Sequence, residues 1–385
     1  MSVTAPEGFR AVGVAAGIRA GGAPDLALVV NGGPFHGAAG VFTRNQVKAA
    51  PVLWSAQVLT GRRLRAVVLN AGGANACTGP GGFQDTHATA ERVAKVLDCG
   101  AVEVAVCSTG LIGERLPLDA VLTGVDTAAA ALAATPEAGL AAATAVLTTD
   151  TVPKQATVTG GGWTVGGFAK GAGMVAPSLA TMLCVLTTDA AVDESTLDAA
   201  LRCATTATFE RLDIDGSCST NDTVLLLASG ASGVTPEAAE FTAAVQQVCH
   251  DLVRGLQADA EGVTKEITIT VRGAATEAQA LAAARAVARD SLVKTAFFGS
   301  DPNWGRIAAA VGASPATVRA DTLDIALNGA LLCQGGAAAG DRSTADLSGR
   351  EITVEIDLHL GPAAATLLTT DLSPGYVDEN SAYSS

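Results

Sequence analysis

The sequence is poor in aromatic residues, in histidine and in positive charge. Aromatic residues make up 4% of its 385 residues, and 24 basic residues face 38 acidic ones, for a formal net charge of −14. An acidic chain is a poor match for nucleic acid or an anionic membrane. No apolar run approaches the roughly 20 residues of a membrane helix, and the first residues lack the pattern of a signal peptide. We therefore expect a cytoplasmic protein with no nucleic-acid and no membrane partner.

Metal-binding and disulfide patterns are also missing. The eight cysteines are scattered without a CxxC pair, and no histidine stands at metal-ligand spacing from a cysteine or another histidine. Such spacing predicts neither a zinc site nor a disulfide framework. We expect no metal, and we expect most of the cysteines to be buried free thiols.

Strand-like and helix-like segments alternate along a chain long enough for two domains. With 49% hydrophobic and 16% charged residues, the composition excludes disorder. Short β-branched runs predict strands at residues 26–31, 66–70, 102–107, 266–271, 351–357 and 365–371. Capping residues and apolar residues at helical spacing predict helices at 195–211, 236–257 and 277–290, and two more within 118–146, separated near Thr135. The pattern indicates an α+β fold with mixed sheets covered by helices.

The composition changes abruptly at residues 159–177, where seven glycines fall within the first fifteen positions. A Walker loop is excluded because Lys170 is followed by Gly171 instead of Ser or Thr. Residues 171–176 fit the loose GxGxxG/A dinucleotide pattern, but the apolar run after Thr181 is strand-like where that motif needs a helix. An ordinary flexible loop leading into a buried strand is a second interpretation.

A self-cleaving turn is the third interpretation of this segment. Glycines allow strained backbone geometry, and the Thr181 hydroxyl can attack the carbonyl of Ala180. Hydrolysis of the resulting ester would free an N-terminal threonine, whose α-amine, with a pKa of about 8, can serve as the base for its own hydroxyl. This chemistry needs no histidine.

The motif KGAGMVAPSLATML, residues 170–183, resembles the cleavage signature of the ornithine acetyltransferase (glutamate N-acetyltransferase) family. The resemblance extends over almost the whole chain, through further motifs in the family's order. These motifs lie at residues 38–52, 70–79, 108–113, 148–151, 219–223, 259–265 and 301–306. The resemblance implies a layered α/β/β/α sandwich with a smaller C-terminal α/β domain. It also implies cleavage into residues 1–180 and 181–385, which associate into an α2β2 assembly.

The resemblance implies acetyl transfer in arginine biosynthesis. Thr181 would take the acetyl group of N-acetylornithine as an ester and pass it to L-glutamate, a ping-pong scheme. No cofactor is implied, and whether acetyl-CoA is also a donor stays open. The family's oxyanion-hole residues map onto Thr109 and Gly110. Its substrate contacts map onto Thr148, Lys170, Thr181, Glu261, Asn380 and Ser385. Lys170 suits a carboxylate and Glu261 an ammonium group.

Two other functions fit the same sequence. A self-processed amidase or aminopeptidase would use the same threonine nucleophile with water as the acceptor, and would deacetylate without glutamate. A non-enzymatic acidic binding protein would keep its chain intact. Without the family resemblance, Thr109 and Gly110 read as an ordinary turn after a strand, Lys170 as a solvated loop lysine and Glu261 as an exposed turn residue.

Overall fold

The computed structural model describes residues 2–176 and 182–382, which form two compact units. Among these residues, the first unit comprises 2–176, 182–210 and 217–256, and the second comprises 211–216 and 257–382. The chain therefore mixes helices and sheets in both units, and the expected α+β class is confirmed.

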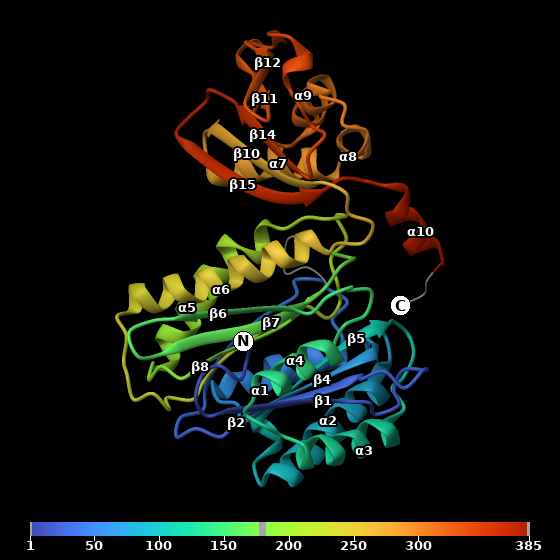
Figure 1. Ribbon diagram of the computed structural model, residues 1–385, viewed down its shortest axis with the longest axis vertical. Coiled ribbons are helices and arrows are strands. Elements are labelled where there is room, and N and C mark those ends of the chain that lie inside the picture. Colours follow the sequence, from blue (N-terminus) through green and yellow to red (C-terminus); the bar gives the residue numbers. More distant parts are fainter. Residues whose placement is uncertain (1, 177–181, 383–385) are drawn as a thin grey trace. The chain divides into compact units, whose positions relative to one another are not determined.

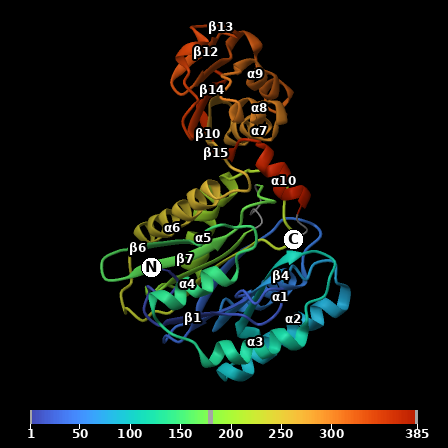
Figure 2. The same cartoon turned by 45° about the vertical axis from the view of Figure 1, so that its right-hand side comes forward.

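The first unit is a sandwich of two sheets between helices (Figures 1 and 2). The four-stranded sheet has the order β1-β2-β4-β5, in which only β4 and β5 run parallel. Its strands are β1 Phe9–Val14, β2 Leu26–Asn31, β4 Ala66–Gly73 and β5 Val104–Leu111. The five-stranded sheet has the order β3-β9-β8-β7-β6, in which β8 and β9 are parallel. Its strands are β3 Gly37–Phe42, β6 Lys154–Thr159, β7 Thr164–Lys170, β8 Leu183–Thr188 and β9 Thr223–Ala228.

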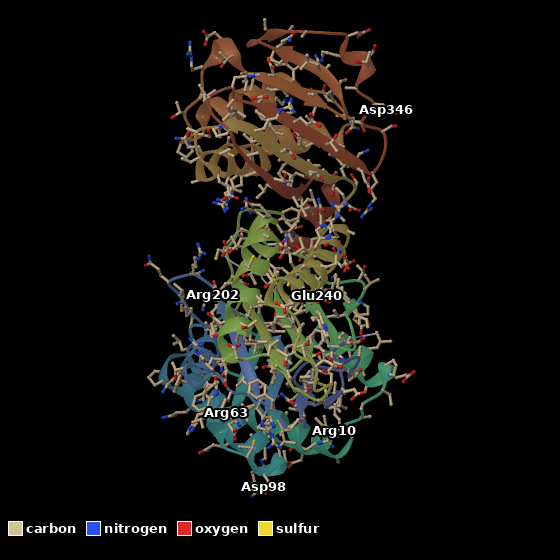
Figure 3. All side chains as sticks on the ribbon, turned by 90° about the vertical axis from the view of Figure 1, so that its left-hand side faces the viewer. Arg10, Arg63, Asp98, Arg202, Glu240 and Asp346 are labelled. Atoms are coloured by element: carbon tan, nitrogen blue, oxygen red, sulfur yellow. The ribbon has the colours of Figure 1, made fainter. Side chains whose placement is uncertain are left out.

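Helices cover the outer faces of this sandwich. The helices α5 Glu194–Ala207 and α6 Ala238–Ala258 lie over the five-stranded sheet, and α2 Gly79–Leu97 and α3 Leu118–Ala130 lie together beyond the other sheet (Figure 1). The helix α1 Ala50–Val58 packs against β5, and α4 Pro136–Ala145 packs against β1. On the outer layer, the exposed side chains of Arg202 on α5 and Glu240 on α6 point away from the ribbon (Figure 3). The expected α/β/β/α layering is present in this unit.

The main core lies between the two sheets. Val29 and Val106 of one sheet belong to the same buried cluster as Phe168 and Leu225 of the other. Strands β2, β8 and β9 are buried at every position, because both of their faces are covered, and such strands carry continuous apolar runs instead of alternation.

The second unit is a six-stranded sheet with the order β13-β12-β11-β14-β10-β15. Its strands are β10 Glu266–Ala274, β11 Asp324–Leu327, β12 Ala330–Gln334, β13 Ala337–Ala338, β14 Glu351–Asp357 and β15 Ala363–Thr370. Its helices are α7 Glu277–Arg289, α8 Ser291–Phe298, α9 Trp304–Ala313 and α10 Pro374–Ala382, with α7 packed on β10 and β15. Alternate residues of β10 and β14 are buried, as their alternating sequences predict.

The predicted elements need three corrections in the first unit. The strand expected at 102–107 begins at Val104, after a 3₁₀ turn at Ala101–Glu103, and continues through Thr109 and Gly110. The helix expected from Ser195 begins at Glu194, because Asp193 accepts the Ser195 and Thr196 amide hydrogens as its N-cap, and a 3₁₀ turn follows it at Phe209–Arg211. The glycine-rich stretch 159–177 is not one loop, because it contains strand β7.

The remaining expected boundaries agree with the structure to within a few residues. Other short 3₁₀ turns lie at Leu59–Gly61, Ala320–Thr322 and Arg342–Thr344. The expectation that most cysteines are buried is only half right: Cys107, Cys184, Cys249 and Cys333 are buried, whereas the other four are partly or fully exposed. Within the described residues, no helix is long and apolar enough to cross a membrane.

Candidate active site

Lys170, Thr109 and Thr148 meet inside the first unit. The Lys170 ammonium donates hydrogen bonds of 2.8 Å to the Thr148 hydroxyl and 3.2 Å to the Thr109 hydroxyl. Lys170 ends β7 of one sheet and Thr109 lies on β5 of the other, so the two sheets of the sandwich jointly form the site. With only 1% of its surface exposed, Lys170 is not the solvated loop lysine of the alternative interpretation.

A second lysine and one aspartate complete a buried charge cluster. Asp150 Oδ1 lies 2.5 Å from Lys154 Nζ and accepts the Gly171 amide hydrogen at 2.6 Å, and Asp150 Oδ2 lies 3.8 Å from Lys170 Nζ. Burial alone would raise the pKa of Asp150, but the Lys170 and Lys154 ammonium groups, with the hydrogen bonds to the carboxylate, hold it below its ordinary value. Asp150 is therefore an anion that fixes both lysines.

The hydrogen bond from Lys170 determines where the hydrogen of the Thr109 hydroxyl can point. Because an ammonium group can only donate, the Thr109 oxygen is the acceptor of this bond, and its own hydrogen is left to point elsewhere. A hydroxyl polarised by a positive charge is a suitable donor to an oxyanion.

Gly110, the neighbour of Thr109 on β5, occupies a position that only glycine fits. Its φ is +127°, and a Cβ there would lie 2.6 Å from the carbonyl carbon of Gly72 and 2.6 Å from the nitrogen of Gly73. The close approach of β4 and β5 therefore requires a glycine beside Thr109.

Buried asparagines hold this end of β4 and β5 in place. Asn221 donates from Nδ2 to the carbonyl oxygens of Ala74, at 2.6 Å, and Ser108, at 2.9 Å. The Ser108 hydroxyl in turn donates to Asn70 Oδ1 at 2.6 Å. These bonds connect the segment before β9 to the strand that carries Thr109.

The expected nucleophile and its scissile bond, Ala180 and Thr181, lie outside the described residues, as does Ser385. The residues that border this segment, Ala176 and Met182, are buried. The amide nitrogen of Met182 donates to Asp222 Oδ1 at 3.2 Å. Leu183 pairs with Lys170 across β7 and β8, so the described chain after Thr181 begins beside the Lys170 cluster.

Glu261 and Asn380 meet each other in the second unit. Asn380 Nδ2 donates to Glu261 Oε2 at 2.8 Å and to the Tyr376 carbonyl oxygen at 2.9 Å. Glu261 lies in the turn after α6, as expected, and Asn380 lies on α10. Two of the expected substrate contacts, 119 residues apart in sequence, are thus neighbours.

Sequence reasoning assigned no role to Asp150, Lys154 or Asp222, although the first and last of these stand inside quoted motifs. Asp150 follows Thr148 in TTDT, and a carboxylate close in sequence to a lysine was the available signal.

The dinucleotide interpretation of residues 171–176 is wrong, because the next described element, β8, is a strand antiparallel to β7 instead of a helix. Among the described residues, no group of three His, Cys, Asp or Glu side chains could hold a metal ion.

Comparison with known proteins identifies the family. A family model described as the ArgJ family matches residues 10–385. The chain belongs to the ArgJ family. This member is 64% identical over 389 aligned positions to a Mycolicibacterium paratuberculosis protein named arginine biosynthesis bifunctional protein ArgJ, and the match covers all of this chain and 96% of the relative. A Streptomyces avermitilis protein of the same name is 59% identical, with both chains fully covered.

Part of the chain is also similar to a solved structure. The crystal structure of ornithine acetyltransferase complexed with ornithine from Mycobacterium tuberculosis is 65% identical in the aligned part. The match covers 46% of this ArgJ-family chain and 95% of that chain, with a TM-score of 0.46. The resemblance inferred from the motifs is confirmed by the family match.

Proposed function

We propose that this chain is a self-processing N-acetyltransferase of arginine biosynthesis, which moves an acetyl group from N-acetylornithine to L-glutamate through an ester on Thr181. Membership of the ArgJ family supports the biosynthetic role. The observation that carries the chemistry is the buried Lys170 ammonium, bonded to the hydroxyls of Thr109 and Thr148. Lys170 pairs with Leu183 across β7 and β8, so it lies beside the chain that follows Thr181.

Self-cleavage before Thr181 would give residues 1–180 and 181–385. The order of the five-stranded sheet explains how these products would stay together. Strands β3, β6 and β7 belong to the first product, and β8 and β9 to the second, yet β7 pairs with β8 and β3 pairs with β9. Cutting one peptide bond leaves those ladders and the shared core in place. We propose that the paired products assemble further as α2β2.

In the first half-reaction, the Thr181 hydroxyl attacks the acetyl carbonyl of N-acetylornithine, the amide C–N bond breaks and ornithine leaves with the proton. In the second, the amine of glutamate attacks the acetyl ester and frees the threonine hydroxyl. The free α-amine of Thr181 serves as base and then as acid. Each tetrahedral intermediate carries an oxyanion, which the Thr109 hydroxyl and the Gly110 amide would stabilise.

The substrates carry carboxylates and ammonium groups, and the proposed contacts carry the opposite charges. Lys170 would meet a substrate carboxylate and Glu261 a substrate ammonium. Thr148, Thr181, Asn380 and Ser385 would supply the remaining polar contacts. The positive charges of Lys154 and Lys170 also outnumber the negative charge of Asp150. This excess of positive charge near Thr109 favours an anionic intermediate.

The word bifunctional in the relatives' names supports a second donor. We propose that acetyl-CoA is a substrate that can also acetylate Thr181, and that no resident cofactor is needed. A cytoplasmic location fits a pathway that uses free amino acids and acetyl-CoA.

Two measurements test this function. Intact mass should show two fragments in place of the 38.2 kDa chain, and sequencing should find one that begins Thr-Met-Leu-Cys. Purified protein should then form N-acetylglutamate from N-acetylornithine only when glutamate is present. Deacetylation at the same rate without glutamate would indicate a hydrolase instead. An active protein that is never cut would remove the α-amine base and with it this mechanism.

A further inference from the structure

Asn221 is a buried amide that connects the two sheets of the first unit at the candidate site, and the mechanism above gives it no role. It lies just before β9, with 5% of its surface exposed. Its Nδ2 donates to the carbonyl oxygens of Ala74, at 2.6 Å, and Ser108, at 2.9 Å. Because a carbonyl oxygen can only accept, the side-chain atom that faces both of them is the amide nitrogen, and both of its hydrogens are used.

The other polar atoms of Asn221 hold its side chain in this orientation. Its Oδ1 accepts the Thr220 hydroxyl hydrogen at 2.6 Å, and its main-chain nitrogen donates to the Ser219 hydroxyl at 3.1 Å. The Thr223 hydroxyl donates to its main-chain carbonyl oxygen at 3.0 Å. A buried polar network whose members are satisfied is rigid, so Asn221 is suited to fix the groups that it bonds.

The Ser108 carbonyl belongs to the peptide group that precedes Thr109. A peptide group is planar, so a fixed Ser108 oxygen also fixes the direction in which the Thr109 main chain continues and its side chain leaves the strand. Strand β5 stands at the end of the order β1-β2-β4-β5, and an edge strand has one side without ladder hydrogen bonds. Bonds from outside the sheet therefore matter most for a strand such as β5.

The two carbonyls that Asn221 holds flank the place where β4 and β5 come closest. Ala74 follows β4 directly, and Gly110, whose amide is the second proposed oxyanion donor, lies against the last two residues of β4. The strand register shifts at those two residues, so the regular ladder alone does not define this end of β5. One amide group fixes both strands here.

Asn221 also links the same two sheets that the Lys170 ammonium links. Leu183 pairs with Thr223 on one side and with Lys170 on the other, so Asn221 and Lys170 lie at the same end of the five-stranded sheet. From this end, the Lys170 ammonium contacts the Thr109 hydroxyl of the opposite sheet at 3.2 Å. The amide of Asn221 therefore holds β5 at the height at which this contact can form.

Resting on the proposed function, we propose that Asn221 is a positioning residue for the oxyanion site. Its amide holds the main chain of β4 and β5 so that the Thr109 hydroxyl and the Gly110 amide point at the same oxyanion. Donors that are already in place stabilise an oxyanion because they need not reorient as the charge develops. Removing the amide should therefore lower kcat and leave KM for both substrates nearly unchanged.

The test compares Asn221→Asp with Asn31→Asp. Aspartate keeps the shape but places an oxygen against two carbonyl oxygens. Asn31 is a matched control because it is also buried and donates from Nδ2 to the carbonyl oxygens of Phe35, at 3.1 Å, and Ala228, at 2.9 Å, the latter at the other end of β9. Both variants should lose similar stability in urea. In Asn221→Asp, kcat per cleaved, folded chain should fall by about 10²-fold, whereas Asn31→Asp should keep its kcat.

A double-mutant cycle with Thr109→Val separates positioning from a general loss of packing. The valine variant has already lost the hydroxyl that Asn221 directs, so adding Asn221→Asp should lower kcat much less than it does in the unmodified protein. Two losses that combine in full would mean that Asn221 acts independently of Thr109, and would overturn the proposal. A loss of kcat that is the same in Asn221→Asp and Asn31→Asp, or absent from both, would overturn it as well.

If Asn221→Asp does not fold, Asn221→Ala decides, with Asn31→Ala as its control, because alanine removes the donor without adding an oxygen. A fall in kcat of about 10-fold or more in Asn221→Ala alone supports the proposal, and equal kcat values overturn it. For a variant that folds but stays uncut, the rate of self-cleavage by intact mass replaces kcat in the same comparison. All of these outcomes leave the proposed function intact, whereas an unmodified, cleaved protein that transfers no acetyl group would defeat that function itself.

Discussion

The Lys154 ammonium lies 2.5 Å from the Asp150 carboxylate, and neither side chain is more than 3% exposed. The same carboxylate faces Lys170 from its other oxygen, at 3.8 Å. One buried anion thus determines where the ammonium that contacts Thr109 and Thr148 is placed. The geometry of the candidate site depends on this carboxylate as much as on the residues that would touch substrate.

Replacing Asp150 should therefore be costly. Asp150→Asn removes the carboxylate that lies beside the buried Lys154 and Lys170 ammonium groups, and breaking a buried pair in this way typically destabilises a protein by about 3–5 kcal/mol. Urea unfolding at neutral pH measures the change. The control is Asp321→Asn, whose partner Arg319 is 62% exposed, so its change should stay within about 1 kcal/mol. Equal effects of the two variants would contradict the structural role given to Asp150.

Thr109 tests the oxyanion assignment through its hydroxyl. Thr109→Val keeps the shape but removes the donor, so kcat for acetyl transfer should fall by about 10²–10³-fold with little change in KM. Thr109→Ser keeps the hydroxyl and should retain most of the activity. Rates must be expressed per cleaved chain, measured by mass, because the same oxyanion site would serve self-cleavage. Equal rates for the valine and serine variants would rule out the hydroxyl as the donor.

Gly110→Ala tests the close approach of β4 and β5. The new Cβ would meet main-chain atoms of Gly72 and Gly73 at 2.6 Å, and the backbone at φ +127° is strained for any other residue. We expect a loss of roughly 1–3 kcal/mol of stability, together with a large loss of transferase activity. Gly113→Ala is the control: its φ is also positive, at +96°, but a Cβ there meets nothing within 4 Å. Gly113→Ala should therefore keep its activity.

The sequence predicted the strands whose residues are β-branched and apolar, and β2 and β14 have the predicted bounds. It failed at β7, where glycine content indicated a loop. The structure supplies the reason. A Cβ at Gly166 would lie 2.4 Å from the Ser2 carbonyl oxygen, and one at Gly167 would lie 2.5 Å from Leu186. These glycines make room for neighbouring segments in a regular strand, which no local pattern reveals.

Residues of the candidate site could be predicted only where they match a motif of the family. Thr109, Thr148 and Lys170 were inferred from the family resemblance, and their proximity depends on two sheets meeting. Lys154 carried no signal, and Asp222 stood in a family motif without an assigned role, because a lysine at the start of a strand and an aspartate in a polar loop are ordinary surface residues until tertiary packing buries them. The pairing of Glu261 with Asn380 is likewise a product of the fold.

Acid should weaken the contribution of Asp150 to stability. Its pKa is held below the ordinary value by the two lysines, so its contribution is present above the pKa of an unfolded aspartate and is lost as the pH falls through the folded pKa. The difference in unfolding free energy between the unmodified protein and Asp150→Asn should therefore shrink as the pH is lowered below about 4. Urea titrations at several acidic pH values measure this difference, and a gap that widens on acidification would contradict the charge assignment.

Asp222 should show the opposite dependence, although it lies in the same unit and is equally buried. Its pKa is raised in the folded protein, so its contribution is fully present below the unfolded pKa, about 3.9, and is lost as the pH rises toward the folded pKa. The stability of the unmodified protein relative to Asp222→Asn should fall with rising pH, by up to about 1.4 kcal/mol per pH unit between the two pKa values. The same urea titrations, extended from pH 4 to 7, measure both aspartates. Opposite slopes for the two variants would establish that one carboxyl is a fixed anion and the other is protonated in the folded protein, whereas parallel slopes would mean that Asp222 is ionised.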